Sequence, residues 1–376
     1  MTPSLPPQDA LGIYVHLPFC RVRCSYCAFA VSTDLRLEDA YGQALLREIA
    51  MRGTGGAPAD TIFWGGGTPS RSSHQWLRRL DRALRETYDV ADGAEVTLEA
   101  NPEDVETSSI AAWTDLGVNR LSVGVQSLHD DELQPLGRIH GRSRALDALG
   151  TAVASGVRVS ADLILGLPGQ TLRSALESVE GVLATGIGHL SMYMLDLEPG
   201  SALSSRVERG LVALPDDEAV AEMYLAAVEL ARRAGLEQYE ISNFARPGER
   251  SVHNLRYWER RGYVGFGAGA HSFAERTRRG NVKNVRAYID ALARDEEPVE
   301  MTERLSEVDE SRERIFLALR RVEGIGYPDL LEWSDGEGRA WCERGLEQGW
   351  LERDGDRIRF TPRGFLVSSE LVAELF

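Results

Sequence analysis

Three of the four cysteines in this chain lie within eight residues, in the segment HLPFCRVRCSYCAFA. They are Cys20, Cys24 and Cys27, in the pattern Cys-x3-Cys-x2-Cys. Free thiols are common in protein cores, so a helical stripe of packed cysteines is one interpretation. The segment also carries a proline, two arginines and a serine, which make it too polar for a packed helix. The pattern therefore favours metal ligation.

Zinc and iron–sulfur clusters are the two alternatives for these thiols. A structural zinc site uses four ligands, often as two separated pairs, but the only other cysteine, Cys342, is distant in the sequence. Iron–sulfur clusters are held by cysteine thiolates. With three thiolates, a four-iron cluster keeps one iron open to a small molecule, and an open iron makes a structural cluster reactive.

A glycine run in WGGGTPS, which includes Gly66, Gly67 and Thr68, is a second candidate for ligand contact. Glycines let a ligand approach the backbone without a Cβ in the way, and their amides can donate to a carboxylate. No Gly-Lys-Ser/Thr follows, which excludes a phosphate loop. A plain turn from strand to helix is the structural alternative.

Single polar residues stand at further positions that suit a ligand. Glu99 in TLEANPED suits an amine or a hydroxyl, or alternatively a helix cap or an ion pair. Gln126 lies in SVGVQS, at the end of the fourth expected strand, and Arg138 follows twelve residues later. Asp162 lies inside the apolar run SADLILGL, so its burial requires a partner, of which a ribose diol is one.

Six β-rich runs, alternating with helical patterns, must position these residues. We expect strands at 12–19, 61–64, 95–100, 120–126, 158–165 and 189–195, and helices at about 37–52, 72–88, 107–116, 130–155 and 171–185. This alternation predicts a parallel α/β sheet, either open or closed into a partial or full barrel. In such folds the chemistry gathers at the carboxyl ends of the strands, where the cysteines lie.

Composition narrows the class of protein. The chain has 376 residues, which is enough for a large domain and a smaller one. Its formal net charge is −16. A net acidic chain is a poor general ligand for nucleic acid, so no nucleic-acid partner is expected. The start shows no secretory signal and no apolar run reaches ~18 residues, so we expect a cytoplasmic protein in a reducing compartment.

The second half of the chain divides into two further regions. We predict a core barrel at 1–235, a connecting region at 236–299, and a C-terminal, mostly helical domain at 300–376. A helix is expected at 216–233 and a strand at 238–244. Asp354-Gly355 is typical of a hairpin turn, and helices followed by a hairpin resemble a winged helix. Acidic residues alternate with its arginines, which favours a lid or partner surface over DNA binding.

The motifs together resemble the radical S-adenosylmethionine (SAM) superfamily. YVHLPFC, WGGGTP, LEANPE, GVQS, DLILGLPGQT, QYEISNFA and GFGAGAHS resemble its coproporphyrinogen dehydrogenase-like, or HemN-like, branch. The resemblance implies a partial (β/α)6 barrel, a 4Fe-4S cluster and SAM. It implies cluster ligands Cys20, Cys24 and Cys27, Tyr14 beside the cluster, Tyr26 near the adenosyl group, and SAM contacts Gly66, Gly67, Thr68, Glu99, Gln126, Arg138 and Asp162.

Two departures from the dehydrogenases matter within this branch. Those enzymes carry a fourth cysteine two residues past the third, where this chain has Phe29, and a longer segment before the first strand. Both features match the HemW-type heme chaperones, as does HNLRYW, which implies that His253, Tyr257 and Trp258 contact heme. Histidine is a common heme ligand. His271 is a second candidate, in a glycine-rich setting that suggests a structural role.

The resemblance thus implies a heme chaperone that delivers heme to heme proteins such as respiratory enzymes. Oxygen-independent coproporphyrinogen III dehydrogenation is the alternative, and another radical reaction is a third. Implied partners are heme, heme-accepting proteins that include membrane-bound ones, and an electron donor such as flavodoxin or ferredoxin. Membrane association would be transient and through partners. We expect no dehydrogenase activity, and the residues leave open whether SAM is cleaved or only bound.

Overall fold

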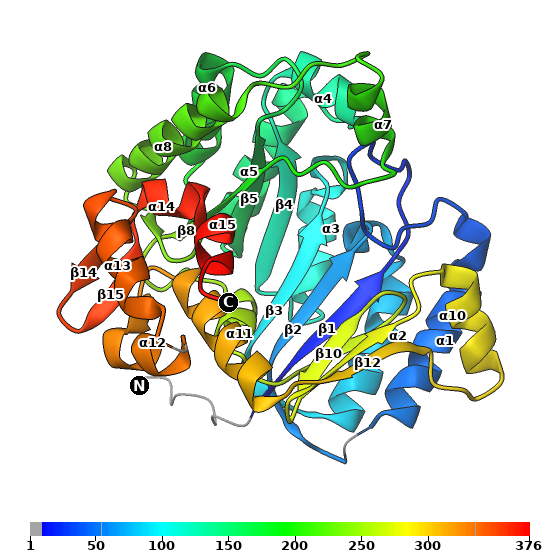
Figure 1. Cartoon of the computed structure of the whole chain (residues 1–376). Coiled ribbons are helices and arrows are strands. Elements are labelled where there is room, and N and C mark those ends of the chain that lie inside the picture. The colour runs from blue at the N-terminus through cyan, green and yellow to red at the C-terminus, as the bar shows by residue number, and fades with distance from the viewer. Residues whose placement is uncertain (1–9, 54, 335) are drawn as a thin grey trace.

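The computed structural model describes residues 10–53, 55–334 and 336–376. Residues 1–9, part of the segment in which no secretory signal was found, lie outside the described residues. The described chain forms a curved twelve-stranded sheet in the order β12-β11-β10-β9-β1-β2-β3-β4-β5-β6-β8-β7 (Figure 1). Its centre consists of six parallel strands, β1 (Leu11–Leu17), β2 (Pro58–Gly66), β3 (Asp89–Ala100), β4 (Arg120–Gln126), β5 (Arg158–Leu165) and β6 (His189–Met194).

Helices that follow these strands cover the outer face of the sheet (Figure 1). They are α1 (Glu38–Met51), α2 (His74–Thr87), α3 (Thr107–Thr114), α5 (Arg142–Ala154), α6 (Leu172–Ala184) and α8 (Asp217–Arg233). On β1, Ile13, Val15 and Leu17 are buried in the core. The alternate residues face the concave side, as the period of a strand requires. The predicted parallel α/β sheet, curved as a partial barrel, is confirmed.

Two predicted elements are wrong in detail. The helix expected at 130–155 is two helices, α4 (Asp130–Leu136) and α5. Gly137 separates them, in the left-handed region with φ 77° that favours glycine after a helix. The strand expected at 238–244 is two short antiparallel strands, β7 (Glu237–Gln238) and β8 (Asn243–Ala245), because the chain reverses between them.

The region at 236–299 extends the sheet at both edges. β8 pairs with β6, while β9 (Tyr263–Phe266) runs parallel to β1. β10 (His271–Ala274), β11 (Thr277–Asn281) and β12 (Val299–Arg304) continue antiparallel. The helices of this region are α9 (Val252–Trp258) and α10 (Val285–Ala293), whereas α7 (Ala202–Glu208) lies earlier, between β6 and α8. The division into three domains stays a prediction.

The C-terminal region is mostly helical, with a small sheet. In order, its elements are α11 (Glu307–Leu319), β13 (Ile325–Gly326), α12 (Tyr327–Trp333), α13 (Gly338–Glu347), β14 (Leu351–Asp354), β15 (Arg357–Phe360), α14 (Pro362–Leu366) and α15 (Ser368–Ala373). The strands form an antiparallel sheet in the order β13-β15-β14. Gly355, with φ 62°, lies in the hairpin between β14 and β15, as expected. This order of elements is winged-helix-like.

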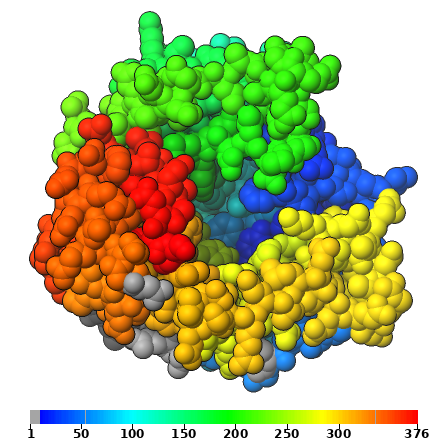
Figure 2. Space-filling model, in the orientation of Figure 1, coloured from blue at the N-terminus to red at the C-terminus, as the bar shows by residue number. Residues whose placement is uncertain are grey.

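Helix α9 packs against the concave side of the sheet through buried polar groups. Glu95 on β3 accepts from Arg120 Nε at 2.9 Å and from the backbone N–H of His253 at 3.0 Å. Arg256 is fully buried, where it pairs with Asp60 and donates to Ala10 O at 2.7 Å. The concave side above this layer remains open, since Figure 2 shows a central hollow whose rim includes the C-terminal residues (red).

None of the helices in the described ranges is both long enough and apolar enough to cross a membrane.

Candidate functional site

The three clustered cysteines lie on an irregular loop that leaves β1. Its base is closed by two backbone hydrogen bonds, from Cys20 N to Ser32 O at 3.0 Å and from Ser32 N to Pro18 O at 2.8 Å. At its far end, Ser25 N donates to Leu136 O at 2.9 Å, and Ser25 O accepts from Leu203 N at 2.8 Å. Four backbone bonds therefore fix the loop, and its three thiols are free and partly exposed.

Hydrogen-bond donors reach two of the sulfurs. Thr68 Oγ1 donates to Cys20 Sγ at 3.4 Å, and Arg138 Nη1 lies 3.7 Å from Cys24 Sγ. Burial raises the pKa of Cys20, and the Thr68 hydroxyl partly offsets this. Burial also raises the pKa of Cys27, and a hydrogen bond from the Phe29 backbone N–H partly offsets this rise. A sulfur that binds a metal must be a thiolate, and hydrogen-bond donors stabilise the thiolate over the thiol.

A single metal ion and an iron–sulfur cluster differ in how close together they hold their thiolates. In the described ranges, no three His, Cys, Asp or Glu side chains are close enough together to hold one metal ion. Iron–sulfur clusters bind one thiolate on each of several irons, so their ligands stand farther apart than those around one zinc. Three thiols on a fixed loop, with donors beside them, fit a four-iron cluster.

The glycine run packs directly against this loop. Gly67 N donates to Leu17 O at 2.8 Å, and Thr68 N donates to Phe19 O at 3.1 Å. A Cβ at Gly67 would lie 2.6 Å from the Pro18 carbonyl carbon. These amides therefore hold the loop and are already engaged, so the run can offer a ligand its carbonyl oxygens, which suit an ammonium.

Glu99 at the end of β3 accepts from Gly66 N at 2.9 Å. Burial, together with repulsion from Asp162, raises the pKa of Glu99 to about 7. Asp162 accepts from Ser122 Oγ at 2.9 Å and from Ser160 Oγ at 3.3 Å, and burial raises its pKa. The partners that the buried Asp162 requires are thus serine hydroxyls, and the two carboxyl groups lie near each other on the concave side.

Arg138 links the cysteine loop to the strand ends. Besides Cys24, its guanidinium donates to Asn101 Oδ1 at 2.8 Å and to Gly124 O at 2.6 Å. Gln126 ends β4 with φ 66°, a left-handed conformation that non-glycine residues rarely adopt and that often marks a functional site. Tyr26 packs in a small apolar cluster with Leu136 and Leu203.

Tyr14 lies on the concave side of β1 and connects to the same loop. Its hydroxyl lies 3.0 Å from His16 Nδ1, and His16 Nε2 lies 2.7 Å from Ala30 O. Sequence reasoning did not select His16 or Asn101. Both stand inside motifs already noted, YVHLPFC and LEANPE, but only the fold shows that each orients a selected residue.

His253 lies deep on the concave side, at the level of Thr61 on β2. Its Nδ1 is 2.8 Å from Thr61 Oγ1, and its Nε2 is 2.8 Å from the Tyr257 hydroxyl. Burial lowers the pKa of His253 to about 3. The imidazole is therefore neutral, and both of its nitrogens are engaged in this conformation.

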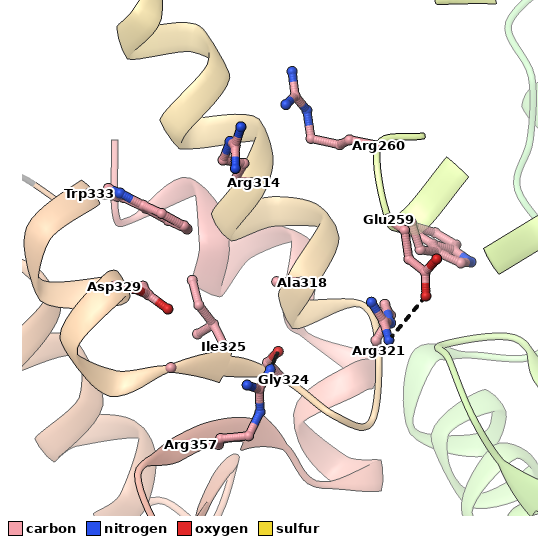
Figure 3. A pocket seen from close by; sticks show the side chains of 12 residues that line it. Glu259, Arg260, Arg314, Ala318, Arg321, Gly324, Ile325, Asp329, Trp333 and Arg357 are labelled. Atoms are coloured by element: carbon pink, nitrogen blue, oxygen red, sulfur yellow. Dashed lines mark hydrogen bonds and ion pairs between the residues drawn. The ribbon is translucent and has the colours of Figure 1, made fainter. Parts of the chain in front are cut away.

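Trp258 faces a different space from His253. It lines a pocket of about 290 Å³ between the end of α9 and the C-terminal helices. Figure 3 shows Trp333 on one side of this pocket, and on the other Arg321, whose Nη2 lies 3.5 Å from Glu259 Oε1. The three predicted heme contacts therefore do not converge on one surface.

Comparisons with known proteins agree with this geometry. A family model for the radical SAM superfamily matches residues 14–181. Heme chaperone HemW of Bacillus subtilis is 35% identical, with 95% of this chain and 97% of the relative aligned. Heme chaperone HemW of Escherichia coli is also 35% identical, over 99% of both. The solved coproporphyrinogen III oxidase (HemN) from Escherichia coli, a radical SAM enzyme, superposes with a TM-score of 0.85 at 22% identity, covering 98% of this chain and 90% of that chain.

Replacing Gly67 by alanine tests whether the glycine run holds the cysteine loop. A Cβ 2.6 Å from backbone atoms of Pro18 forces the loop away from β2, because backbone cannot turn aside as a side chain can. We expect a several-fold loss of iron and sulfide per chain after anaerobic reconstitution. Gly93→Ala is the matched control, since a Cβ there meets nothing within 4 Å. Full cluster content in Gly67→Ala contradicts the assignment.

Glu99 predicts a specific pH dependence of stability. Its pKa rises from 4.5 in the unfolded chain to about 7 in the folded protein, so the folded state binds more protons between these values. The free energy of unfolding therefore falls as pH rises from about 4.5 to about 7. The Glu99→Gln variant does not show this loss of stability. The loss that it avoids is at most roughly 3 kcal/mol in the free energy of unfolding, reached above pH 7.

Urea unfolding of the metal-free proteins at several pH values measures the effect. The difference between Glu99→Gln and wild type should grow up to about pH 7 and then stay constant. Glu240, whose pKa burial also raises to about 7, is present in both proteins and cancels. A difference that does not vary with pH rejects the raised pKa of Glu99.

Proposed function

The chain belongs to the heme chaperone HemW family of the radical SAM superfamily. From this premise we propose that it binds heme and passes it to heme proteins. The observation that carries this proposal is the cysteine loop, which keeps three thiols and places the exposed Phe29 two residues past Cys27. The dehydrogenases of this branch carry a fourth cysteine at that position. The similarity to HemN supports a shared fold, and whether this chain has dehydrogenase activity is a matter for experiment.

In this proposal Cys20, Cys24 and Cys27 hold a 4Fe-4S cluster and the neighbouring strand ends hold SAM. When bound, the cluster supplies one electron to SAM. Thr68 and Arg138 donate toward the sulfurs at 3.4 and 3.7 Å. Donors of this kind favour the thiolate form.

The acidic residues match the donors of SAM. The Glu99 carboxylate and the carbonyl oxygens of Gly66 and Gly67 accept from the methionyl ammonium. Asp162 exchanges a serine partner for a ribose hydroxyl, and Tyr26 packs beside the adenosyl group. Gln126 at the end of β4 and Arg138, which follows α4 and donates to Gly124 O on β4, close the site. Each role is proposed from position at the carboxyl edge of the sheet.

For heme, we propose contact with α9 through His253 and Tyr257 on the concave side, with Trp258 as a separate contact at the end of the helix, where it lines the pocket of about 290 Å³. Burial keeps the His253 imidazole neutral, which is the form that binds iron. Ligation requires the ring to give up its hydrogen bond to the Tyr257 hydroxyl. His271 on β10 is the alternative ligand, and its ring is exposed.

We further propose that the protein works in the reducing cytoplasm, where thiols remain available for a cluster. Its partners are heme-accepting proteins, membrane-bound ones included, and a one-electron donor such as flavodoxin or ferredoxin. Membrane association occurs only through such partners.

The first test compares the two candidate activities in one preparation. The reconstituted protein, loaded with heme, should transfer it to an apo-heme protein, followed by the Soret absorbance of the acceptor. The same protein, incubated anaerobically with SAM, a reductant and coproporphyrinogen III, should form no vinyl product. Vinyl product without heme transfer reverses the assignment in favour of the dehydrogenase.

The second test concerns the heme ligand. His253→Ala should lose the shifted Soret band. Tyr257→Phe removes a hydroxyl that competes for Nε2, a bond worth about 1 kcal/mol, so heme binding should strengthen by about fivefold. His271→Ala is the matched comparison and should keep the wild-type spectrum. Loss of the band in His271→Ala but not in His253→Ala moves the ligand to β10.

A further inference from the structure

Phe29 is a large apolar side chain on the protein surface. It is 65% exposed, although it lies only two residues past Cys27. Its backbone N–H makes a hydrogen bond to the Cys27 sulfur. The side chain therefore points to solvent, while the backbone of the same residue faces the sulfur. No role in the proposed heme or SAM sites uses this side chain.

A groove of about 480 Å³ lies beside Phe29, between the cysteine loop and the start of α10. Residues 28–32 form one wall, and Lys283, Asn284 and Arg286 form the other. In Figure 1, α10 (yellow) lies beside α1 (blue), on the side of the molecule where the loop after β1 emerges. The groove is thus an outer surface of the loop, separate from the concave side.

The groove is positively charged on a chain whose net charge is −16. Arg23 and Lys283 line it, are exposed, and make no ion pair with any described residue. Arg286 also lines it and shares the carboxylate of Asp34 with Arg36. Three cations in the groove lining therefore stand against one carboxylate, and Lys283 is the only lysine in the whole sequence.

Exposed apolar side chains on the cysteine loop and just after it add to this charge. Val22 is 48% exposed and Leu35 is 38% exposed. An exposed aromatic residue surrounded by arginines is the composition found at the centre of protein interfaces, where it supplies most of the binding energy. The surrounding cations steer an acidic partner and set its orientation.

We propose that this groove docks an acidic protein that carries single electrons, so that the electron enters the cluster beside Cys27. This proposal rests on the proposed cluster at the three thiols. In the step itself the carrier is oxidised by one electron and the cluster is reduced by one, and no covalent bond forms or breaks. A second copy of this chain does not fit, because a two-fold contact would set these cations against themselves.

The test uses the cluster-loaded protein and reduced flavodoxin as the probe. Arg23→Glu combined with Lys283→Glu reverses the two unpaired charges, and Phe29→Ala removes the apolar anchor. Arg339→Glu combined with Arg363→Glu is the matched control, since both arginines are exposed and lie in the C-terminal region. Calorimetry gives the dissociation constant, and anaerobic stopped-flow absorbance gives the rate of cluster reduction.

Both groove variants should weaken flavodoxin binding and slow cluster reduction at least tenfold, while the control stays within twofold of wild type. Reduction by dithionite, a small reductant, should be unchanged in every variant. Wild-type binding should weaken as salt is added, because exposed charges are screened.

Three outcomes overturn the proposal. In the first, the groove variants bind flavodoxin and accept its electron as wild type does. In the second, flavodoxin binding by the wild type does not respond to salt. In the third, cluster reduction by dithionite falls in parallel with cluster reduction by flavodoxin. If the groove variants still accept electrons from flavodoxin at the wild-type rate but lose heme transfer, the groove binds the heme acceptor instead. Failure of wild-type heme transfer, with the groove effects intact, rejects the chaperone function and leaves the docking site.

Discussion

The contact between the end of β2 and the loop after β1 is the constraint on which the site depends. Two backbone hydrogen bonds, from Gly67 N to Leu17 O and from Thr68 N to Phe19 O, join the two segments. They form only because Gly67 has no Cβ, which would collide with the Pro18 backbone. Backbone contacts between the two segments therefore position the loop.

The concave side of the sheet is held by buried polar groups, which require exact partners. Glu95 accepts from Arg120 and from the N–H of His253, and thereby fixes where α9 begins. Glu48 on α1 accepts from Gly267 N at 2.8 Å and from the Tyr288 hydroxyl at 2.6 Å. Position 267 requires glycine because its φ is 104° and a Cβ there would lie 2.6 Å from His16 O. Buried ion pairs add little net stability because of their desolvation cost, but removing one partner is costly. We infer that these groups determine position more than they add stability.

The sequence predicted the local part of this design well and the long-range part poorly. Strand ends and the cysteine loop follow from short patterns, and the structure has strands at all six predicted positions. The break at Gly137 was missed although Pro135, Gly137 and Gly141 all disfavour helix at this point. His253 shows the limit most clearly. Its motif is visible in six residues, but its hydrogen bond to Thr61 spans 192 positions, and only the fold shows that the ring is enclosed.

The structure also separates two routes to the cysteine loop. The polar strand ends approach it from the concave side, where Glu99 and Asp162 favour a ligand that carries donors. Phe29 and the unpaired cations lie on the outer side, next to α10. A single loop can serve both because its backbone contacts β2 on one side while its side chains remain free on the other. A fourth cysteine in place of Phe29 would put a thiol on that outer surface and remove the exposed aromatic side chain. The change of one residue therefore alters which surface the loop presents to a partner, without changing how the loop is held.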